Sequence, residues 1–225
     1  MKKLVYAIAL IVGIAGVSLE LWILKSKGKS SRPTGDGVIL QRVEKDPDAP
    51  LDKFKQVPEF DFTDRDHQKV NRGDLRGKVW LADFIYTTCP DTCPMLSRRL
   101  SNLQERALAL GEEYGGDGVR LVSFSVDPEH DTPEILSGYA KALGATPKWH
   151  FLTGDLPHIQ RVAREGFLIG FEKVPGVTDE ISHSTKIALV DQKGIVRRYY
   201  DGIGDNDESE QILKDVRKLL EEAKK

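Results

Sequence analysis

Two kinds of apolar pattern alternate along most of the chain. A continuous apolar run at 78–86 predicts a central strand that is covered on both faces of a sheet, and 118–126 is the next predicted strand. Between them, leucine and alanine positions recur every three or four residues over 95–110, which predicts an amphipathic helix that ends near Gly111. The pattern therefore indicates a strand, a helix and a second strand in succession, as at the start of an α/β domain.

Further predicted elements continue this alternation to the end of the chain. They are, in order along the sequence, a hairpin over 60–70 ahead of the first long strand, a helix that Thr132 caps and Pro133 begins, a strand over 149–154, a helix over 155–165, a hairpin over 186–200 around Gln192-Lys193-Gly194, and an amphipathic helix over 207–225. This order predicts a mixed central sheet flanked by helices, the layout of a thioredoxin-like α/β fold.

The N-terminus has a different pattern, because it is apolar on every side. Leu4–Leu24 is interrupted only by Ser18 and Glu20, and at 1.5 Å per residue such a helix is about 30 Å long, enough to cross a bilayer core. An uncleaved anchor is expected rather than a cleaved signal peptide, whose apolar core is shorter. Lysines flank the run on both sides, so charge alone does not orient it.

The residues after the apolar run are expected to form a tether followed by one domain. We expect a transmembrane signal-anchor at 1–25, a flexible tether rich in Lys, Ser, Gly, Asp and Pro at 26–57, and a thioredoxin-like domain at 58–225. A chain of 225 residues that is 40% hydrophobic can build one domain with a sizeable core. Its net charge of −2 and pI near 6.2 argue against a nucleic-acid partner, which requires a basic face.

The chain has two cysteines, Cys89 and Cys93, placed where the first central strand is expected to lead into a helix. The free N–H groups and the positive end of the helix dipole favour thiolate there. A spacing of four places both sulfurs on one helical face, which suits the binding of one ion. A disulfide over so short a loop would contribute little stability, so the pair is interpreted as a redox or a metal site.

A histidine ligand would favour a metal. His183 lies just before the strand at 186–191, and in a thioredoxin-like fold the loop that leads into that strand passes beside the cysteines. Two thiolates and an imidazole suit Cu(I), and could hold Cu(II) with further donors. The other four histidines are expected in solvated, capping or structural positions; they are His67, His130, His150 and His158.

Three segments together resemble the Sco/SenC family of membrane-anchored copper proteins that serve cytochrome c oxidase assembly. They are FIYTTCPDTCPML at 84–96, SVDPEHDTPEILSGYA at 125–140 and ISHSTKIALVD at 181–191, and they occur in the family's order. The resemblance covers roughly 58–222. It implies that copper, as Cu(I) and also Cu(II), is held by Cys89, Cys93 and His183.

The resemblance also implies partners and a location. Family members act on the Cu(A) site of oxidase subunit II, either delivering copper or keeping its thiols reduced, and an upstream copper donor or thiol reductase would reload the site. The Lys-Lys start lacks the Arg- and Ser-rich stretch of a mitochondrial presequence. We therefore expect a single-pass protein of the bacterial inner membrane with its C-terminal domain in the periplasm.

Two other functions remain open at this point. A thiol–disulfide reductase acting on oxidase cysteines would need Cys89 and Cys93 but not His183. A peroxiredoxin-like peroxidase would need an activating arginine beside its cysteine, and the sequence offers no convincing assignment of one.

Two aspartates are candidates for roles beside the ligands. Asp83 lies inside the apolar run at 78–86, where a carboxylate is costly unless it is paired, hydrogen-bonded or protonated. We hypothesise that Asp83 holds or accepts a proton when the thiols bind metal or form a disulfide, although a polar contact alone would also explain it. Asp91, between the cysteines, is expected either to adjust the local charge or to be an ordinary exposed turn residue.

Overall fold

The computed structural model describes residues 50–115, 118–173, 181–182 and 184–224. The chain divides into two compact units, 1–45 and 46–225, and every described residue belongs to the second. No helix among the described residues is both long and apolar enough to span a membrane. The predicted anchor and most of the predicted tether lie outside the described residues.

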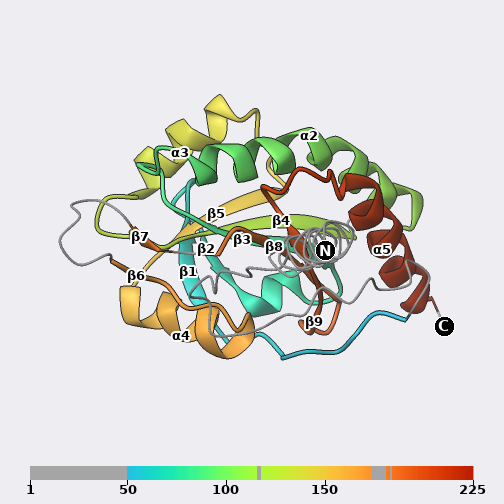
Figure 1. Cartoon of the computed structure of the whole chain (residues 1–225). Helices are drawn as coiled ribbons and strands as arrows, with labels where there is room; N and C mark the ends of the chain where they lie inside the picture. The colour runs from blue at the N-terminus through green and yellow to red at the C-terminus, as the bar shows by residue number, and fades with distance from the viewer. Residues whose placement is uncertain (1–49, 116–117, 174–180, 183, 225) are drawn as a thin grey trace, which may run out of the picture. The chain divides into compact units, whose positions relative to one another are not determined.

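The core of the domain is a mixed seven-stranded sheet in the order β2-β1-β5-β4-β3-β8-β9 (Figure 1). The strands are β1 Asp61–Asp64, β2 Lys69–Asn71, β3 Val79–Ile85, β4 Val119–Ser125, β5 Trp149–Thr153, β8 Lys186–Val190 and β9 Val196–Asp201. β3, β4 and β5 are parallel, and the outer strands pair antiparallel. A separate ladder joins β6 (Glu172–Lys173) to β7 (Ile181–Ser182). The predicted mixed sheet is confirmed.

Helices cover both faces of this sheet. They are the 3₁₀ helix η1 Arg72–Leu75 and the α-helices α2 Thr92–Glu113, α3 Pro133–Ala142, α4 Leu156–Gly166 and α5 Ser209–Glu222. α2 and α3 lie over one face, α4 lies under the other, and α5 packs against α2 (Figure 1). This arrangement confirms the thioredoxin-like layout and places the cysteine segment between β3 and α2.

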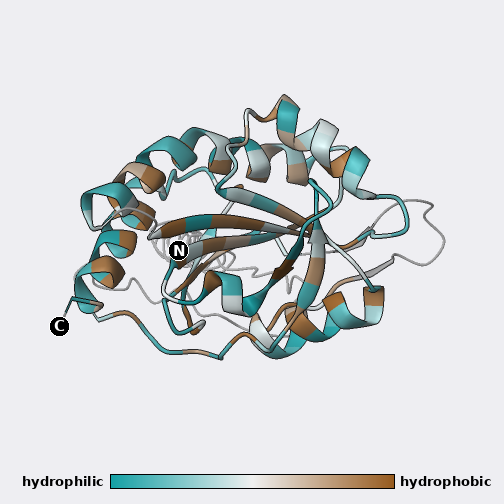
Figure 2. Ribbon diagram, turned by 180° about the vertical axis from the view of Figure 1, so that it is seen from behind, coloured by the Kyte–Doolittle hydropathy of each residue, from teal (hydrophilic) through white to brown (hydrophobic). Residues whose placement is uncertain are grey.

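The two faces of β3 differ in chemistry. Trp80 and Phe84 meet the ring of Phe167, which follows α4, at centroid distances of 5.9 and 5.2 Å. Asp83 alternates with them along the strand and so faces α2. All seven residues of β3 are buried, as its continuous apolar run predicts. Figure 2 shows apolar colour along the central strands and a mixture of polar and apolar colour along the helices.

The prediction that Gly111 ends the helix after the cysteines is wrong. α2 continues to Glu113, and the chain turns at Gly115, whose φ of +126° favours glycine. Gly111 instead permits close packing, since a Cβ there would lie 3.0 Å from the backbone nitrogen of Val119. The glycine belongs to the contact between α2 and β4.

Local signals at other boundaries are confirmed. Thr132 caps α3 by accepting a bond from the Ile135 N–H, and Pro133 is the first helical residue. Gly194 adopts a φ of +78° in the turn between β8 and β9.

The packed domain begins before residue 58, the predicted start of the thioredoxin-like domain. Val57 is fully buried and donates to the Gly194 carbonyl at 2.8 Å. Phe54 donates to the Val196 carbonyl at 2.9 Å, so this segment pairs with the edge of β9. The polar sequence around these residues concealed that interaction, because single apolar residues between lysines show no strand period.

Candidate metal centre

Cys89 lies in the loop between β3 and α2, and Cys93 lies in the first turn of α2. The Cys89 N–H donates to the Tyr86 carbonyl at 3.3 Å, which closes a turn, and the Cys93 N–H donates to the Cys89 sulfur at 3.3 Å. The two cysteines are not joined in a disulfide, and Cys89 is 7% exposed and Cys93 0% exposed. The predicted position at a strand-to-helix junction is confirmed, and only Cys89 is open to a partner.

The Cys89 site favours the thiolate. Burial raises the pKa of Cys89, but hydrogen bonds from the Thr92 hydroxyl and from the backbone N–H groups of Cys93 and Asp91 outweigh it and lower the pKa to about 6. The Thr92 oxygen lies 3.5 Å from the sulfur. Cys89 is therefore mostly ionised at neutral pH.

The Cys93 site favours the thiol. Burial raises the pKa of Cys93 well above its usual range, and the negative charges of Cys89 and Asp83 raise it further. A backbone interaction with Tyr86 opposes this shift without reversing it. The pair therefore holds a single proton at neutral pH, and a cation between the sulfurs would displace it.

Asp83 lies on the α2 face of the sheet with its carboxylate fully buried. The Ser123 hydroxyl donates to one carboxylate oxygen at 2.6 Å and itself accepts from the Trp149 indole at 3.0 Å. The other oxygen has no partner among the described residues. Burial raises the pKa of Asp83 to about 7, although the hydrogen bonds oppose the shift. A group with this pKa can hold or release a proton near neutrality.

Asp91 occupies the N-cap position of α2, but its side chain makes no capping hydrogen bond and is exposed. Its contribution to the site comes from its backbone N–H, which favours the Cys89 thiolate.

His183 lies outside the described residues, which resume at Ser184 just before β8. β8 is antiparallel to β3, so the start of β8 lies beside the end of β3 that leads to the cysteines. The Gly202 N–H donates to the Thr185 carbonyl at 2.9 Å. A Cβ on Gly202 would lie 2.0 Å from the Leu96 side chain of α2 and 2.5 Å from that carbonyl. The chain two residues beyond position 183 is thus close to the first turns of α2.

The other histidines lie in varied environments. His67 is 61% exposed and pairs with Glu134, as expected of a solvated turn residue. His150 lies 3.5 Å from a carboxylate oxygen of Asp64, and burial lowers its pKa. The expectation that His158 is solvated is wrong, because its ring packs 4.8 Å from that of Phe62 and is half-buried.

A sequence comparison assigns the family. The sequence profile of the SCO1/SenC family matches residues 48–221. The chain belongs to the SCO1/SenC family.

Solved structures of the family share the fold of this chain. A SCO1/SenC family lipoprotein from Bacillus anthracis is 33% identical with a TM-score of 0.67, over 76% of this chain and 98% of that one. BsSco, a cytochrome c oxidase assembly protein described with a disulfide switch, is 32% identical with a TM-score of 0.64, over 77% and 96%. Bradyrhizobium japonicum ScoI with copper bound is 28% identical with a TM-score of 0.59, over 72% and 99%.

The described part of the candidate centre in this SCO1/SenC chain contains two potential metal ligands, the sulfurs of Cys89 and Cys93. Among the described residues, no group of three or more His, Cys, Asp or Glu side chains could hold a metal ion. The two adjacent sulfurs nevertheless fit a soft ion of low coordination number, such as Cu(I). The candidate third ligand, His183, is the one that the structure does not describe.

Sequence reasoning missed Asp131, which holds the cysteine turn in place. Asp131 is fully buried and accepts from the Thr87 hydroxyl at 2.5 Å and the Ser125 hydroxyl at 2.6 Å. The Thr87 N–H donates to the same carboxylate at 3.2 Å. The sequence held a signal for this contact. Loops that follow parallel neighbouring strands meet at one edge of the sheet, and Thr87 follows β3 while Asp131 follows β4.

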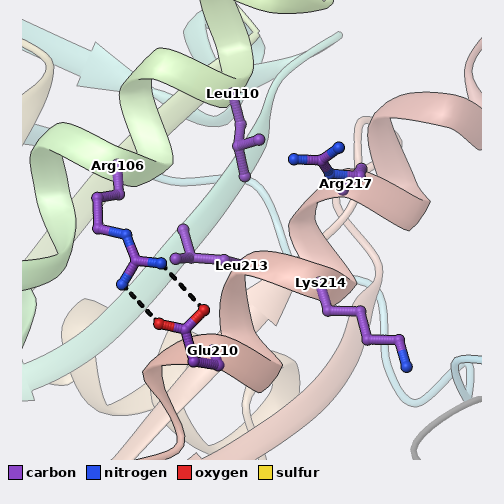
Figure 3. Close-up of a pocket in the computed structure, with 6 residues that line it drawn as sticks. All are labelled: Arg106, Leu110, Glu210, Leu213, Lys214 and Arg217. Atoms are coloured by element: carbon purple, nitrogen blue, oxygen red, sulfur yellow. Dashed lines mark hydrogen bonds and ion pairs between the residues drawn. The ribbon is translucent and has the colours of Figure 1, made fainter.

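A cavity of about 360 Å³ lies between α2 and α5 (Figure 3). It is lined by Arg106, Leu110, Glu210, Leu213, Lys214 and Arg217. Arg106 joins Glu210 across it through contacts of 2.8 and 3.0 Å. Arg106 lies 13 residues beyond Cys93 in α2, about 20 Å along the helix axis. The cavity is therefore no part of the candidate centre.

Proposed function

We propose that this chain binds one copper ion through Cys89, Cys93 and His183 and acts in cytochrome c oxidase assembly. The observation that carries the proposal is the thiol pair itself, a thiolate and a buried thiol within hydrogen-bonding distance at a helix N-terminus. Its family membership and its likeness to a copper-bound ScoI structure support copper as the ion. Thiolate and imidazole donors suit Cu(I), and Cu(II) would need further donors.

Binding requires Cys93 to lose its proton. A positive ion between the sulfurs offsets the cost of a second buried negative charge. Asp83 is a candidate acceptor, since its charge acts on Cys93 and its pKa is about 7. If Asp83→Asn changed neither copper affinity nor the titration of the thiols, Asp83 would have no such role.

Delivery would proceed by ligand exchange with acceptor thiolates. The acceptor that we propose is the Cu(A) site of oxidase subunit II, in keeping with the description of BsSco as an oxidase assembly protein. The apolar run Leu4–Leu24 would hold donor and acceptor on one membrane surface, on the periplasmic side, and so raise their effective concentration. The lipoprotein relative supports membrane association.

A thiol–disulfide reductase is the second candidate, favoured by the difference between the two cysteines. The Cys89 thiolate would attack a partner disulfide, and Cys93 would then displace the partner's second sulfur as a thiol. The partner gains two electrons and two protons, one from Cys93 and one from solvent, and the pair becomes a disulfide. BsSco is described with a disulfide switch.

A competitive Cu(I) titration of the reduced full chain tests the proposal. One equivalent should bind tightly. His183→Ala and Cys93→Ser should each weaken binding by at least about 100-fold, because loss of a group that only supports a metal ligand already costs up to about that much. The matched control is His67→Ala, which removes an exposed imidazole that pairs with Glu134 and should change nothing. Weak binding that is insensitive to His183, with a reversible Cys89–Cys93 disulfide, would favour the reductase.

A further inference from the structure

His130 is a second imidazole beside the cysteine turn, and the proposed copper site does not use it. Its Nδ1 lies 3.3 Å from the Thr87 hydroxyl and 3.1 Å from the Asp131 carboxylate. Thr87 is a central residue of the turn that the Cys89 N–H closes onto the Tyr86 carbonyl. The imidazole therefore borders the turn that presents the accessible thiolate.

Hydrogen bonding fixes the tautomer of this ring. The Thr87 hydroxyl donates its proton to Asp131 at 2.5 Å, so its oxygen offers lone pairs to His130. The Asp131 carboxylate also only accepts. Both neighbours of Nδ1 are thus acceptors, so Nδ1 carries the proton and Nε2 presents a lone pair. A carboxylate on the far nitrogen is the arrangement that orients metal-ligating histidines in general and increases their basicity.

The three potential copper ligands at this edge of the sheet differ in solvent exposure. The side chain of His130 is 45% exposed, whereas Cys89 is 7% exposed and Cys93 is fully buried. An ion arriving from solvent would meet the imidazole before the thiolate, and the thiolate before the buried thiol.

We propose that His130 Nε2 is an outer docking ligand that holds copper briefly on its way to and from Cys89. On entry the bond from copper to Nε2 would break as the bond to the Cys89 sulfur forms, and on exit the bond to Nε2 would form as the bond to the sulfur breaks. No electron would be transferred in either direction. The inference rests on the proposed copper function and extends it, because it assigns the exchange route to a residue outside the final site. Asp131 is its positioning residue.

A chain without the thiols tests the docking ligand directly. In the full chain carrying Cys89→Ser and Cys93→Ser, a substoichiometric amount of Cu(II) should broaden the ring resonances of His130 before those of His67. His67 is the matched control, an exposed imidazole on a carboxylate whose Nε2 is already occupied by Glu134 at 3.1 Å. Equal broadening of both rings, or earlier broadening of His67, would overturn the proposal. Ring nitrogen shifts without copper should show the Nδ1–H tautomer, and the Nε2–H tautomer would also overturn it.

Exchange kinetics separate this inference from the proposed function. In the chain with both thiols, His130→Ala should keep the equilibrium Cu(I) affinity within about twofold and slow transfer to and from a chelator about tenfold, as expected when one ligand-shell group is lost. His67→Ala should alter neither quantity. An unchanged transfer rate in His130→Ala would overturn the docking role while leaving the copper site intact. Weak Cu(I) binding by the unmodified chain would instead refute the copper function itself.

Discussion

The turn that carries Cys89 and the helical turn that carries Cys93 have opposite effects on a negative charge at sulfur. In the first, a hydroxyl and two backbone N–H groups outweigh burial and lower the pKa of the thiol to about 6. In the second, burial dominates, and the charges of Cys89 and Asp83 raise the pKa further. Position at a helix N-terminus therefore does not by itself activate a thiol. The balance between burial and the hydrogen bonds donated to the sulfur decides the outcome.

This difference assigns separate tasks to the two residues. The thiolate of Cys89 can meet a partner or an ion, whereas Cys93 becomes charged only when something positive arrives or its sulfur is bonded. The same asymmetry serves both copper binding and disulfide exchange, which explains why the pair alone does not separate the two candidate functions.

The largest expected effect is the pH dependence of the unfolding free energy that comes from Asp83. Its folded-state pKa of about 7 is raised above the ordinary value of 3.8, so its contribution to stability is fully present below the unfolded pKa and is lost as pH rises through about 7. The loss amounts to roughly 4 kcal/mol of unfolding free energy. Asp83→Asn keeps an acceptor for Ser123 and should remove this pH dependence. Urea unfolding of the reduced protein at pH 4 and pH 8 measures it, and parallel pH profiles of the two proteins would refute the buried-carboxyl account.

The second largest expected effect is a difference in alkylation rate between Cys89 and Cys93. At pH 7 the thiolate fraction of Cys89 should exceed that of Cys93 by at least about 100-fold, since one pKa lies below and the other above neutrality. Alkylation rates of Cys93→Ser, which retains Cys89, and of Cys89→Ser, which retains Cys93, provide the measurement. The rate for Cys89 should level off above a midpoint near pH 6. Comparable rates for the two variants would remove the asymmetry.

A smaller change should weaken the asymmetry without abolishing it. Thr92→Val removes the hydroxyl beside the Cys89 sulfur and should raise the midpoint of Cys89 alkylation by about 1 pH unit, the effect of about one hydrogen bond to a charged group. Thr88→Val is the matched control, because Thr88 is exposed in the same turn. A midpoint that moves equally in both variants would show that the turn, not the hydroxyl, sets the pKa.

Periodicity and cap signals were sufficient for most of the fold. The continuous run of β3, the leucine spacing of α2 and the Thr132-Pro133 start of α3 report directly on burial and backbone geometry. The end of α2 was mispredicted because a glycine can serve packing as well as termination. Gly111 packs against β4, while Gly115 provides the turn.

The candidate site could be predicted only where chemistry is visible in residue types. Cys89 and Cys93 are conspicuous thiols, and their junction position follows from the flanking strand and helix. Their opposite pKa shifts depend on burial and on donors such as the Thr92 hydroxyl, which sequence spacing does not reveal. Asp131 was missed because its role arises from a contact between two loops far apart in sequence.

X-ray absorption at the copper edge of the reduced full chain, loaded with one equivalent of Cu(I), tests the central claim most directly. The account predicts two sulfur donors and one nitrogen donor, with the nitrogen lost in His183→Ala and retained in His130→Ala. A copper environment without two sulfurs, or one whose nitrogen persists in His183→Ala, would contradict the three-ligand site.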